Sequence, residues 1–318
     1  MAICVWMHRF RYCNSCLECK PERSMIYLLI NQLARRGKGA KSASKIFHYL
    51  EKLDVSYSLV PGETLAEVKN NLQSLVDQKV ERIIVAGGDG IIHHAIQSVA
   101  TTETILGVIP IGTGNDFCRA LNIPADIEKA VALSLKASKP IDLLKVNSRW
   151  VASVMTFGFS SDVNSRAEKM RWPTGPSRYT VATLASLRAL SSNYVQFTVD
   201  DVQHERDVSL WNIANTSDFG GGMNISPSAN PFDGVANLTL VSKVSRFELL
   251  RFFRRVFSGT HMSHPKVDGL QGKRVVVTTK GLGLWADGEF IGESPATIDL
   301  VPGAIQLAGC PDNLKYGI

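Results

Sequence analysis

Two glycine-rich segments, each carrying an aspartate, hold the residue types that could do chemistry in this chain. Residues 85–95 read VAGGDGIIHHA and residues 109–117 read IPIGTGNDF, and each glycine turn follows an apolar run. Glycines let backbone amides approach phosphate oxygens closely, and a helix that begins near Ile91 would add its N-terminal dipole. Because a carboxylate repels phosphate, Asp89 in such a loop suggests a bridging cation, contact with a ligand hydroxyl or proton transfer.

Both segments also have a simpler structural explanation. A strand that turns into a helix often carries an aspartate as a helix cap, and Asp116, at the start of a predicted helix, fits that role. Thr113 and Asn115 nevertheless add a hydroxyl and an amide as donors beside it. The sequence contains no GxGxxG motif, no GxxxxGK motif followed by Ser or Thr, and no HRD and DFG pair. A nucleotide would therefore have to be held in another way.

The elements that must position these residues follow a regular pattern from Met25 onwards. Apolar, β-branched runs alternate with segments of helical periodicity, which is typical of a parallel sheet covered by helices. Since ligands bind outside the carboxyl ends of such strands, both glycine turns should face the same crevice. The pattern predicts strands at 25–31, 55–60, 82–87, 105–110 and 141–146, and helices at 40–53, 64–78, 93–100, 116–121 and 126–135.

The character of the chain changes after Val146. Short alternating strands are predicted at 195–200, 209–215 and 235–241, with helical segments at 178–190 and 246–257, which indicates a β-rich second domain. A length of 318 residues also favours two cores over one. The predicted divisions are an N-terminal extension at 1–24, an α/β nucleotide-binding domain at 25–146, and a β-rich domain at 147–310 whose final segment could pack back on the first.

Composition narrows the class of protein and its partners. The net charge of +6 favours anionic partners, but no basic tail argues for nucleic acid. No apolar run approaches the ~18 residues of a membrane span, so a soluble or peripheral protein is expected. Four of the six cysteines crowd the first nineteen residues without a second CxxC pair or a following HxxxH to complete a zinc signature. Residues 1–24 are therefore expected to be a disordered tail or to precede a true start at Met25.

Four ordered motifs together resemble one family. GGDG at 87–90, IPIGTGNDFCRALNIP at 109–124, IANTSDFGGGMNISPSANPFDG at 213–234 and WADGE at 285–289 are similar to the diacylglycerol kinase catalytic family. That family includes bacterial lipid kinases and sphingosine and ceramide kinases, and it is related to NAD kinase. The resemblance implies ATP-dependent phosphoryl transfer to a lipid hydroxyl, with the nucleotide between a Rossmann-like α/β domain and a C-terminal β-sandwich domain.

The resemblance also implies roles for individual residues. Asp287 and Glu289 match an acidic pair, one of which accepts the proton of the lipid hydroxyl, and Asp142 matches an acidic position that joins a magnesium-linked network with that base. A structural metal in the second domain would use Asp233, with backbone oxygens of Asn230 and Val235. The nucleotide-binding positions carried over are Asn31, Thr64, Gly87, Gly88, Asp89, Gly90 and Thr113.

Some positions depart from the family pattern or have competing explanations. The first loop reads NQLARRGKG, with Gln32 and Arg35 where the family usually has Pro and Gly, and Ile91 replaces a common Thr. Asp287 and Glu289 would point to the same side if WADGE were extended, but Gly288 also suits a tight approach or a solvated hairpin turn.

Three further features have less specific patterns. His93 and His94 would point about 100° apart on a helix and could not readily chelate one ion together, so surface or packing roles are favoured. The basic and aromatic helix at 246–257 could lie at an anionic membrane, although a domain-packing helix with a solvated basic face is the favoured interpretation. Residues 169–179, KMRWPTGPSRY, are a second candidate for membrane contact or a lid.

These observations predict a lipid kinase that uses ATP and Mg²⁺, with diacylglycerol as the leading acceptor and phosphatidic acid as the product. Alternative acceptors are a sphingoid base, ceramide, a phospholipid headgroup or NAD, and the non-enzyme alternative is a regulator that binds nucleotide or lipid. The expected partners are ATP and a lipid acceptor at an anionic membrane surface, with no nucleic acid, and a homodimer is left open. The expected location is cytoplasmic with peripheral membrane association.

Overall fold

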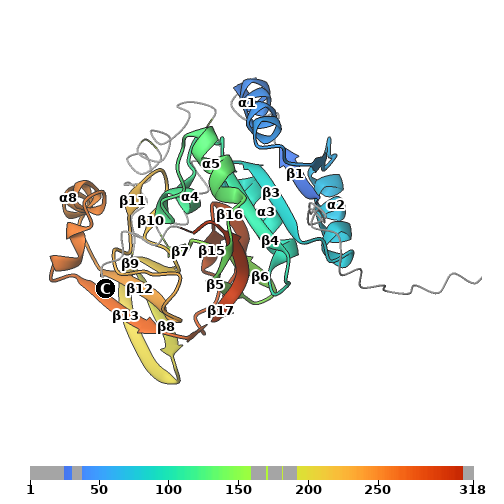
Figure 1. The fold of residues 1–318 in the computed structure, drawn as a ribbon. Coiled ribbons are helices and arrows are strands. Elements are labelled where there is room, and N and C mark those ends of the chain that lie inside the picture. The colour runs from blue at the N-terminus through green and yellow to red at the C-terminus, as the bar shows by residue number, and fades with distance from the viewer. Residues whose placement is uncertain (1–24, 31–37, 159–169, 171–180, 182–191, 311–318) are drawn as a thin grey trace, which may run out of the picture.

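The structure, a computed structural model, describes residues 25–30, 38–158, 170, 181 and 192–310. An α/β part and a β-rich part lie side by side and share strands of one continuous 15-stranded sheet (Figure 1). The expected α/β fold with a second β-rich domain is confirmed. The N-terminal extension and the predicted helix at 178–190 lie outside the described residues, except for Val181.

The α/β part is built on parallel strands in the order β2-β1-β3-β4. The predicted alternation of strands and helices is confirmed, and helix α3 begins four residues earlier than its periodicity suggested. The elements are β1 Ile26–Ile30, α1 Lys38–Lys52, β2 Tyr57–Leu59, α2 Leu65–Asp77, β3 Arg82–Gly87, α3 Asp89–Val99, β4 Ile105–Pro110, α4 Asp116–Ala120 and α5 Ile127–Ser134.

Helices cover both faces of this parallel sheet. Ile46 of α1 and Val131 of α5 belong to the core on one face, while Leu72 of α2 and Ile96 of α3 belong to the core on the other. Apolar side chains at helical spacing produce these buried stripes, and the side chain of Thr64 caps α2 by accepting a hydrogen bond from the backbone of Glu67. Burial on both faces explains why the strands read as continuous apolar runs.

The β-rich part packs its strands around a core of its own. Phe157 and Trp211 stack there with ring centroids 4.0 Å apart, and Phe197 lies against Trp211. The elements are β5 Ser138–Val146, β6 Arg149–Val151, β7 Val154–Gly158, β8 Asn193–Val199, β9 Val202–Ala214, β10 Asp218–Phe219, β11 Met223–Asn224, β12 Ala236–Ser242, α8 Arg246–Val256, the 3-10 helix η2 Thr260–Ser263, β13 Val267–Gly272, β14 Arg274–Val277, β15 Gly283–Ala286, β16 Glu289–Glu293 and β17 Ala296–Ala308.

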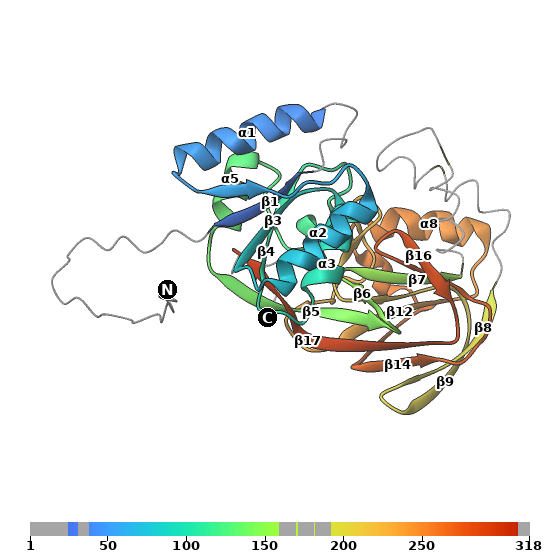
Figure 2. The same cartoon turned by 90° about the vertical axis from the view of Figure 1, so that its right-hand side faces the viewer.

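Strand β17 joins the two parts. Its beginning pairs antiparallel with β14, and its end pairs parallel with β4, where Gln306 lies opposite Ile105. Along most of its length it also pairs with β5, which leads out of the α/β part. Ile298 belongs to the β-rich core and Leu307 to a core of the α/β part. The long red strand is seen crossing the molecule in Figure 2.

Candidate active site

The two glycine turns meet at the carboxyl ends of β3 and β4. The amides of Ile111 and Gly112 donate to the carbonyl oxygen of Gly87 at 3.0 and 3.2 Å. A Cβ atom added to Gly112 would lie 2.4 Å from the Cα of Gly88, a distance that no side chain could tolerate. The turns therefore need glycine so that their backbones can touch, and this contact brings the loop of Asp89 against the loop of Asp116.

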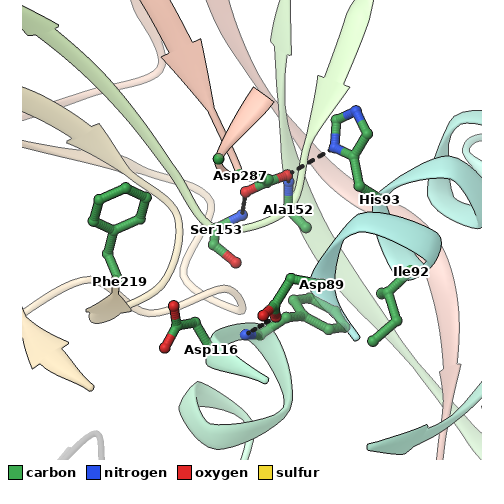
Figure 3. A pocket seen from close by; sticks show the side chains of 10 residues that line it. Asp89, Ile92, His93, Asp116, Ala152, Ser153, Phe219 and Asp287 are labelled. Atoms are coloured by element: carbon green, nitrogen blue, oxygen red, sulfur yellow. Dashed lines mark hydrogen bonds and ion pairs between the residues drawn. The ribbon is translucent and has the colours of Figure 1, made fainter. Parts of the chain in front are cut away.

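Asp89, Asp116 and Asp287 line one small pocket of about 70 Å³ (Figure 3). They come from the start of α3, the start of α4 and the turn between β15 and β16. The pocket is large enough for a few water-sized groups, so it suits a reacting centre better than a whole nucleotide. The other described residues that line it are Ile92, His93, Phe117, Ala152, Ser153, Phe219 and Gly288.

Asp287 is held by three donors. Its Oδ2 accepts from the amide of Ala152 at 2.8 Å and lies 3.1 Å from Nδ1 of His93, while its Oδ1 accepts from the amide of Ser153 at 2.8 Å. Asp287 and Gly288 have positive φ values of 49° and 86° and form the loop of a tight hairpin. The extended geometry considered for WADGE is therefore wrong. The turn directs the Asp287 carboxylate into the pocket, whereas Glu289 is exposed and does not line it.

His93 belongs to this site rather than to a helix surface. Its side chain is 2% exposed and contacts Asp287 across a sequence separation of 194 residues. The Gln97 amide is oriented by β6, because its Nε2 donates to the carbonyl of Trp150 and its Oε1 accepts from the amide of Trp150. Since Nε2 of Gln97 also lies 3.4 Å from Nε2 of His93, that ring nitrogen is placed to accept, which leaves the proton on Nδ1. His93 Nδ1 then donates to Asp287.

Asp89 has an unusual protonation equilibrium. Burial, together with the neighbouring charge of Asp116, raises its pKa from 3.8 to about 6, although backbone amides of Phe117 and Asn115 partly oppose the shift. The charge of Asp287 adds a smaller contribution in the upward direction. Three carboxylates around one pocket repel each other, and a cation would relieve this repulsion.

Asp116 links the second glycine turn to the β-rich part. Its carboxylate accepts from the amides of Gly221 and Gly222 at 2.9 to 3.1 Å and is paired with Arg119. Arg119 also donates to the carbonyl of Gly114 at 2.6 Å. The interpretation of Asp116 as a mere helix cap misses this link between GTGND and GGGM, two motifs that are about 100 residues apart in the sequence.

The predicted nucleotide-binding positions surround the start of α3. Thr64 lines a groove of about 720 Å³ that also includes Ile30 and Ile91, and the next residue of α3, Ile92, lines the aspartate pocket. Gly90 lies on the first turn of α3, and Thr113 is exposed in the GTGND turn. Asn31 and the rest of the unusual first loop, 31–37, lie outside the described residues.

Asp142 occupies a different environment from the aspartate pocket. Its two carboxylate oxygens accept from the amides of Gly234 and Gly303 at 2.9 and 2.8 Å, so it ties the NPFDG loop to β17. In that loop Asp233 accepts from the amide of Val235, and burial raises the pKa of Asp233. The carbonyl of Asn230 faces the amide of Asp233. The catalytic role of Asp142 and the metal role of the loop stay predictions.

Comparisons with known proteins match this architecture. Residues 25–146 match the diacylglycerol kinase catalytic domain, and residues 153–309 match the YegS C-terminal NAD kinase beta sandwich-like domain. A diacylglycerol kinase of Mycobacterium tuberculosis is 33% identical over 296 residues, which cover 91% of this chain and 96% of the relative. The chain belongs to the diacylglycerol kinase catalytic family.

Other members of the diacylglycerol kinase family agree in sequence and in fold. A diacylglycerol kinase of Staphylococcus carnosus is 31% identical over 240 residues, covering 74% of this chain and 77% of the relative. A solved Bacillus anthracis structure aligns with a TM-score of 0.75 at 22% identity, covering 91% of this chain and 98% of the other. Another solved structure, of a diacylglycerol kinase from the same organism, aligns with a TM-score of 0.70 at 19% identity and covers the same shares of both chains. The kinase family and the fold expected from the sequence motifs are confirmed.

Proposed function

We propose that this protein transfers the γ-phosphoryl group of ATP to the hydroxyl of a membrane lipid, with diacylglycerol as the acceptor and phosphatidic acid as the product. The observation that carries the proposal is the meeting of Asp89, Asp116 and Asp287 around one pocket beside the N-terminus of an α-helix. Helix N-termini attract phosphate, and carboxylates handle cations and protons, so this arrangement combines both requirements of phosphoryl transfer.

The nucleotide would lie in the groove next to α3. The groove has the volume of a small-molecule site, and it reaches Thr64 and Ile91. The first amides of α3 have no intrahelical partner, since its first backbone bond is from Ile92 to Gly88, so they can donate to phosphate oxygens. The phosphates would then point towards the aspartate pocket on the other side of the helix start.

The residues fit a magnesium ion that is shared with the nucleotide. In the described part of the chain, no group of three or more His, Cys, Asp or Glu side chains is arranged as a protein-only metal site. Magnesium commonly uses one or two carboxylates together with substrate phosphates. Asp89 lies in the pocket, and a nearby cation would offset the burial and the carboxylate repulsion that raise its pKa. When bound, the ion supplies charge neutralisation at the transferring phosphoryl group.

Asp287 is the proposed proton acceptor. Among the described residues its Oδ1 accepts from one amide, that of Ser153, so one lone pair remains for the acceptor hydroxyl. As the hydroxyl oxygen bonds to the γ-phosphorus, its proton moves to Asp287 while the bond from the γ-phosphorus to the bridging oxygen breaks and leaves ADP. The amides of Ala152 and Ser153 hold the carboxylate in place during this transfer.

The activity can be tested with labelled ATP, Mg²⁺ and a mixed lipid extract, followed by identification of the labelled product. We expect labelled phosphatidic acid with the wild-type chain and almost none with Asp287→Asn, while Glu289→Gln, altered at an exposed neighbour, retains most of the rate. Label on NAD alone would favour a NAD kinase. Binding of ATP and lipid without any product would favour a non-catalytic regulator.

A further inference from the structure

Helix α8 has an inner side that packs and an outer side that does not. Leu249 and Phe252 are buried, and the Phe252 ring lies 4.4 Å from the ring of His264. On the outer side, Phe247 is 82% exposed and Phe257 is 48% exposed. Such exposure of large aromatic side chains indicates a contact surface when several lie together.

The same outer side is strongly basic. Arg251, Arg254 and Arg255 are all exposed. Glu248 is the only acidic residue of the helix, and it is turned towards the body of the protein, where its carboxylate accepts from Lys266 at 2.7 Å and from the amide of Ser245. The positive charges on the outer side are therefore not balanced by an acidic residue of α8.

Aromatic and basic side chains are interspersed on this side and do not form an apolar patch with a separate basic rim. Phe247 and Arg254 are seven residues apart and so lie almost in line along the helix, with exposed Leu250 between them. The capping box formed by Ser245 and Glu248 fixes the first turn, so the helix is ordered before any partner arrives. Apolar anchors mixed with arginines are typical of helices that lie in the headgroup region of a membrane.

The position of α8 favours an extended surface as its partner over a peptide segment that binds in a groove. The helix lies at the outer edge of the molecule in Figure 1. A bound peptide usually needs a groove, which a projecting helix does not offer. A second copy docked symmetrically here would bring arginines against arginines, which repel each other.

We propose that the outer face of α8, formed by Phe247, Leu250, Arg251, Arg254 and Phe257, docks this protein on an anionic bilayer. Docking would hold the protein at the surface that contains its lipid acceptor, and in that respect the proposal rests on the proposed kinase function. No helix of the described residues is long and apolar enough to cross a bilayer, so attachment through α8 would be to the surface.

Vesicle sedimentation with the full chain tests the docking directly. The vesicles are phosphatidylcholine alone or phosphatidylcholine mixed with phosphatidylglycerol. We expect the wild-type chain to bind the anionic vesicles more tightly and to be released by salt. The double variant Phe247→Ser/Arg254→Ser should bind roughly tenfold or more weakly, because one aromatic anchor and one charge are lost. The matched control is Val202→Ser/Lys280→Ser, which changes an exposed apolar and an exposed basic residue elsewhere.

Four outcomes would overturn the docking proposal. These are equal binding to both vesicle types, unchanged binding of the Phe247→Ser/Arg254→Ser variant, an equal loss in the control, or a wild-type dimer that the α8 variant dissociates. Circular dichroism checks that the variants stay folded, and Arg251→Ser/Arg254→Ser provides a second test that leaves every aromatic side chain in place.

Kinase assays separate this proposal from the proposed function. The α8 variant should phosphorylate a soluble short-chain diacylglycerol at the wild-type rate but act slowly on diacylglycerol in anionic vesicles. Vesicle binding that depends on α8 without any kinase activity would support docking and refute the proposed function. Kinase activity with vesicle binding that does not depend on α8 would refute docking and leave the proposed function standing.

Discussion

At the scale of single residues, the protonation of Asp89 should control the use of a cation. The pKa of Asp89 is raised from 3.8 to about 6 by burial and by Asp116, so the folded chain favours the protonated carboxyl below that pH. A cation needs the ionised form, so the increase in Tm caused by Mg²⁺ and ATP should be larger well above pH 6 than well below it. Asp89→Asn should remove this pH dependence, and an unchanged dependence in that variant would exclude Asp89 as its source.

The raised pKa of Asp89 also predicts how the stability of the ligand-free chain changes with pH. A carboxyl whose pKa is raised on folding stabilises the folded chain while protonated, and this contribution is lost as the pH rises from about 4 to about 6. Chemical denaturation at several pH values should show this loss in the wild-type chain. The loss should be smaller in Asp89→Asn, since an amide does not titrate in this range.

His93 should act by positioning Asp287. Replacing His93 by Phe keeps a ring but removes the donor to a charged carboxylate, an interaction of about 1.5–3 kcal/mol. We expect kcat to fall by roughly 10- to 150-fold with little change in the KM for ATP, since the groove near Thr64 is untouched. His93→Asn carries an amide donor near the position of Nδ1 and should recover part of the rate. Equal losses in both variants would indicate only a packing role.

Sequence motifs could identify the aspartates but not this histidine. GGDG and WADGE mark Asp89 and Asp287, whereas His93 lies one turn beyond GGDG in a run with ordinary helical periodicity. Its contact with Asp287 spans 194 positions, and although the Asp-Gly pair of WADGE suits a hairpin turn, no local pattern shows that the β15–β16 turn brings this carboxylate to His93. The available signal was a polar residue on an otherwise apolar stretch of helix, and that pattern has many structural explanations.

At the scale of elements, the link from α4 to the β10–β11 turn should stabilise the interface between the two parts. Asp116→Ala removes the acceptor for the amides of Gly221 and Gly222 and leaves Arg119 without its carboxylate partner. We expect a loss of about 3 kcal/mol in the free energy of unfolding, because hydrogen bonds to a charged group are lost.

A matched control for this change exists on the neighbouring helix. Asp126 caps α5 by accepting from the amide of Lys129, and within the described part of the chain its carboxylate forms no hydrogen bond with the β-rich part. Asp126→Ala should cost only about 1 kcal/mol, as for an ordinary N-cap. If urea denaturation gave equal losses for Asp116→Ala and Asp126→Ala, Asp116 would be no more than a helix cap.

Elements with strong periodicity were predictable, and their long-range pairing was not. The strand and helix pattern of the α/β part follows from apolar runs and from caps such as Thr64. The parallel pairing of β17 with β4 joins residues about 200 positions apart, and no local pattern encodes that neighbour. The sequence predicted that the final segment could pack back on the first domain, but it did not identify β4 as the strand with which that segment pairs.

At the scale of the whole molecule, β17 should make the two cores unfold together. Ile298 and Leu307 lie on this one strand but belong to different cores, and each is almost fully buried. Ile298→Ala or Leu307→Ala should each cost about 2–5 kcal/mol. In either variant, tryptophan fluorescence, to which Trp211 in the β-rich core and Trp150 beside a core of the α/β part both contribute, and far-ultraviolet circular dichroism should each show one transition with the same midpoint. Separate midpoints would show that the parts are independent.

The position of β17 after all the other described elements has a consequence for biosynthesis. A ribosome releases β17 last among the described elements, so the emerging polypeptide lacks one strand partner of β4 and one of β14 until all the other described elements have emerged. The two cores that contain β17 residues are incomplete before that point, because both include side chains from this strand. Both of these cores are thus expected to form only after β17 has left the ribosome, and chaperones that shield nascent chains would bind the protein until then.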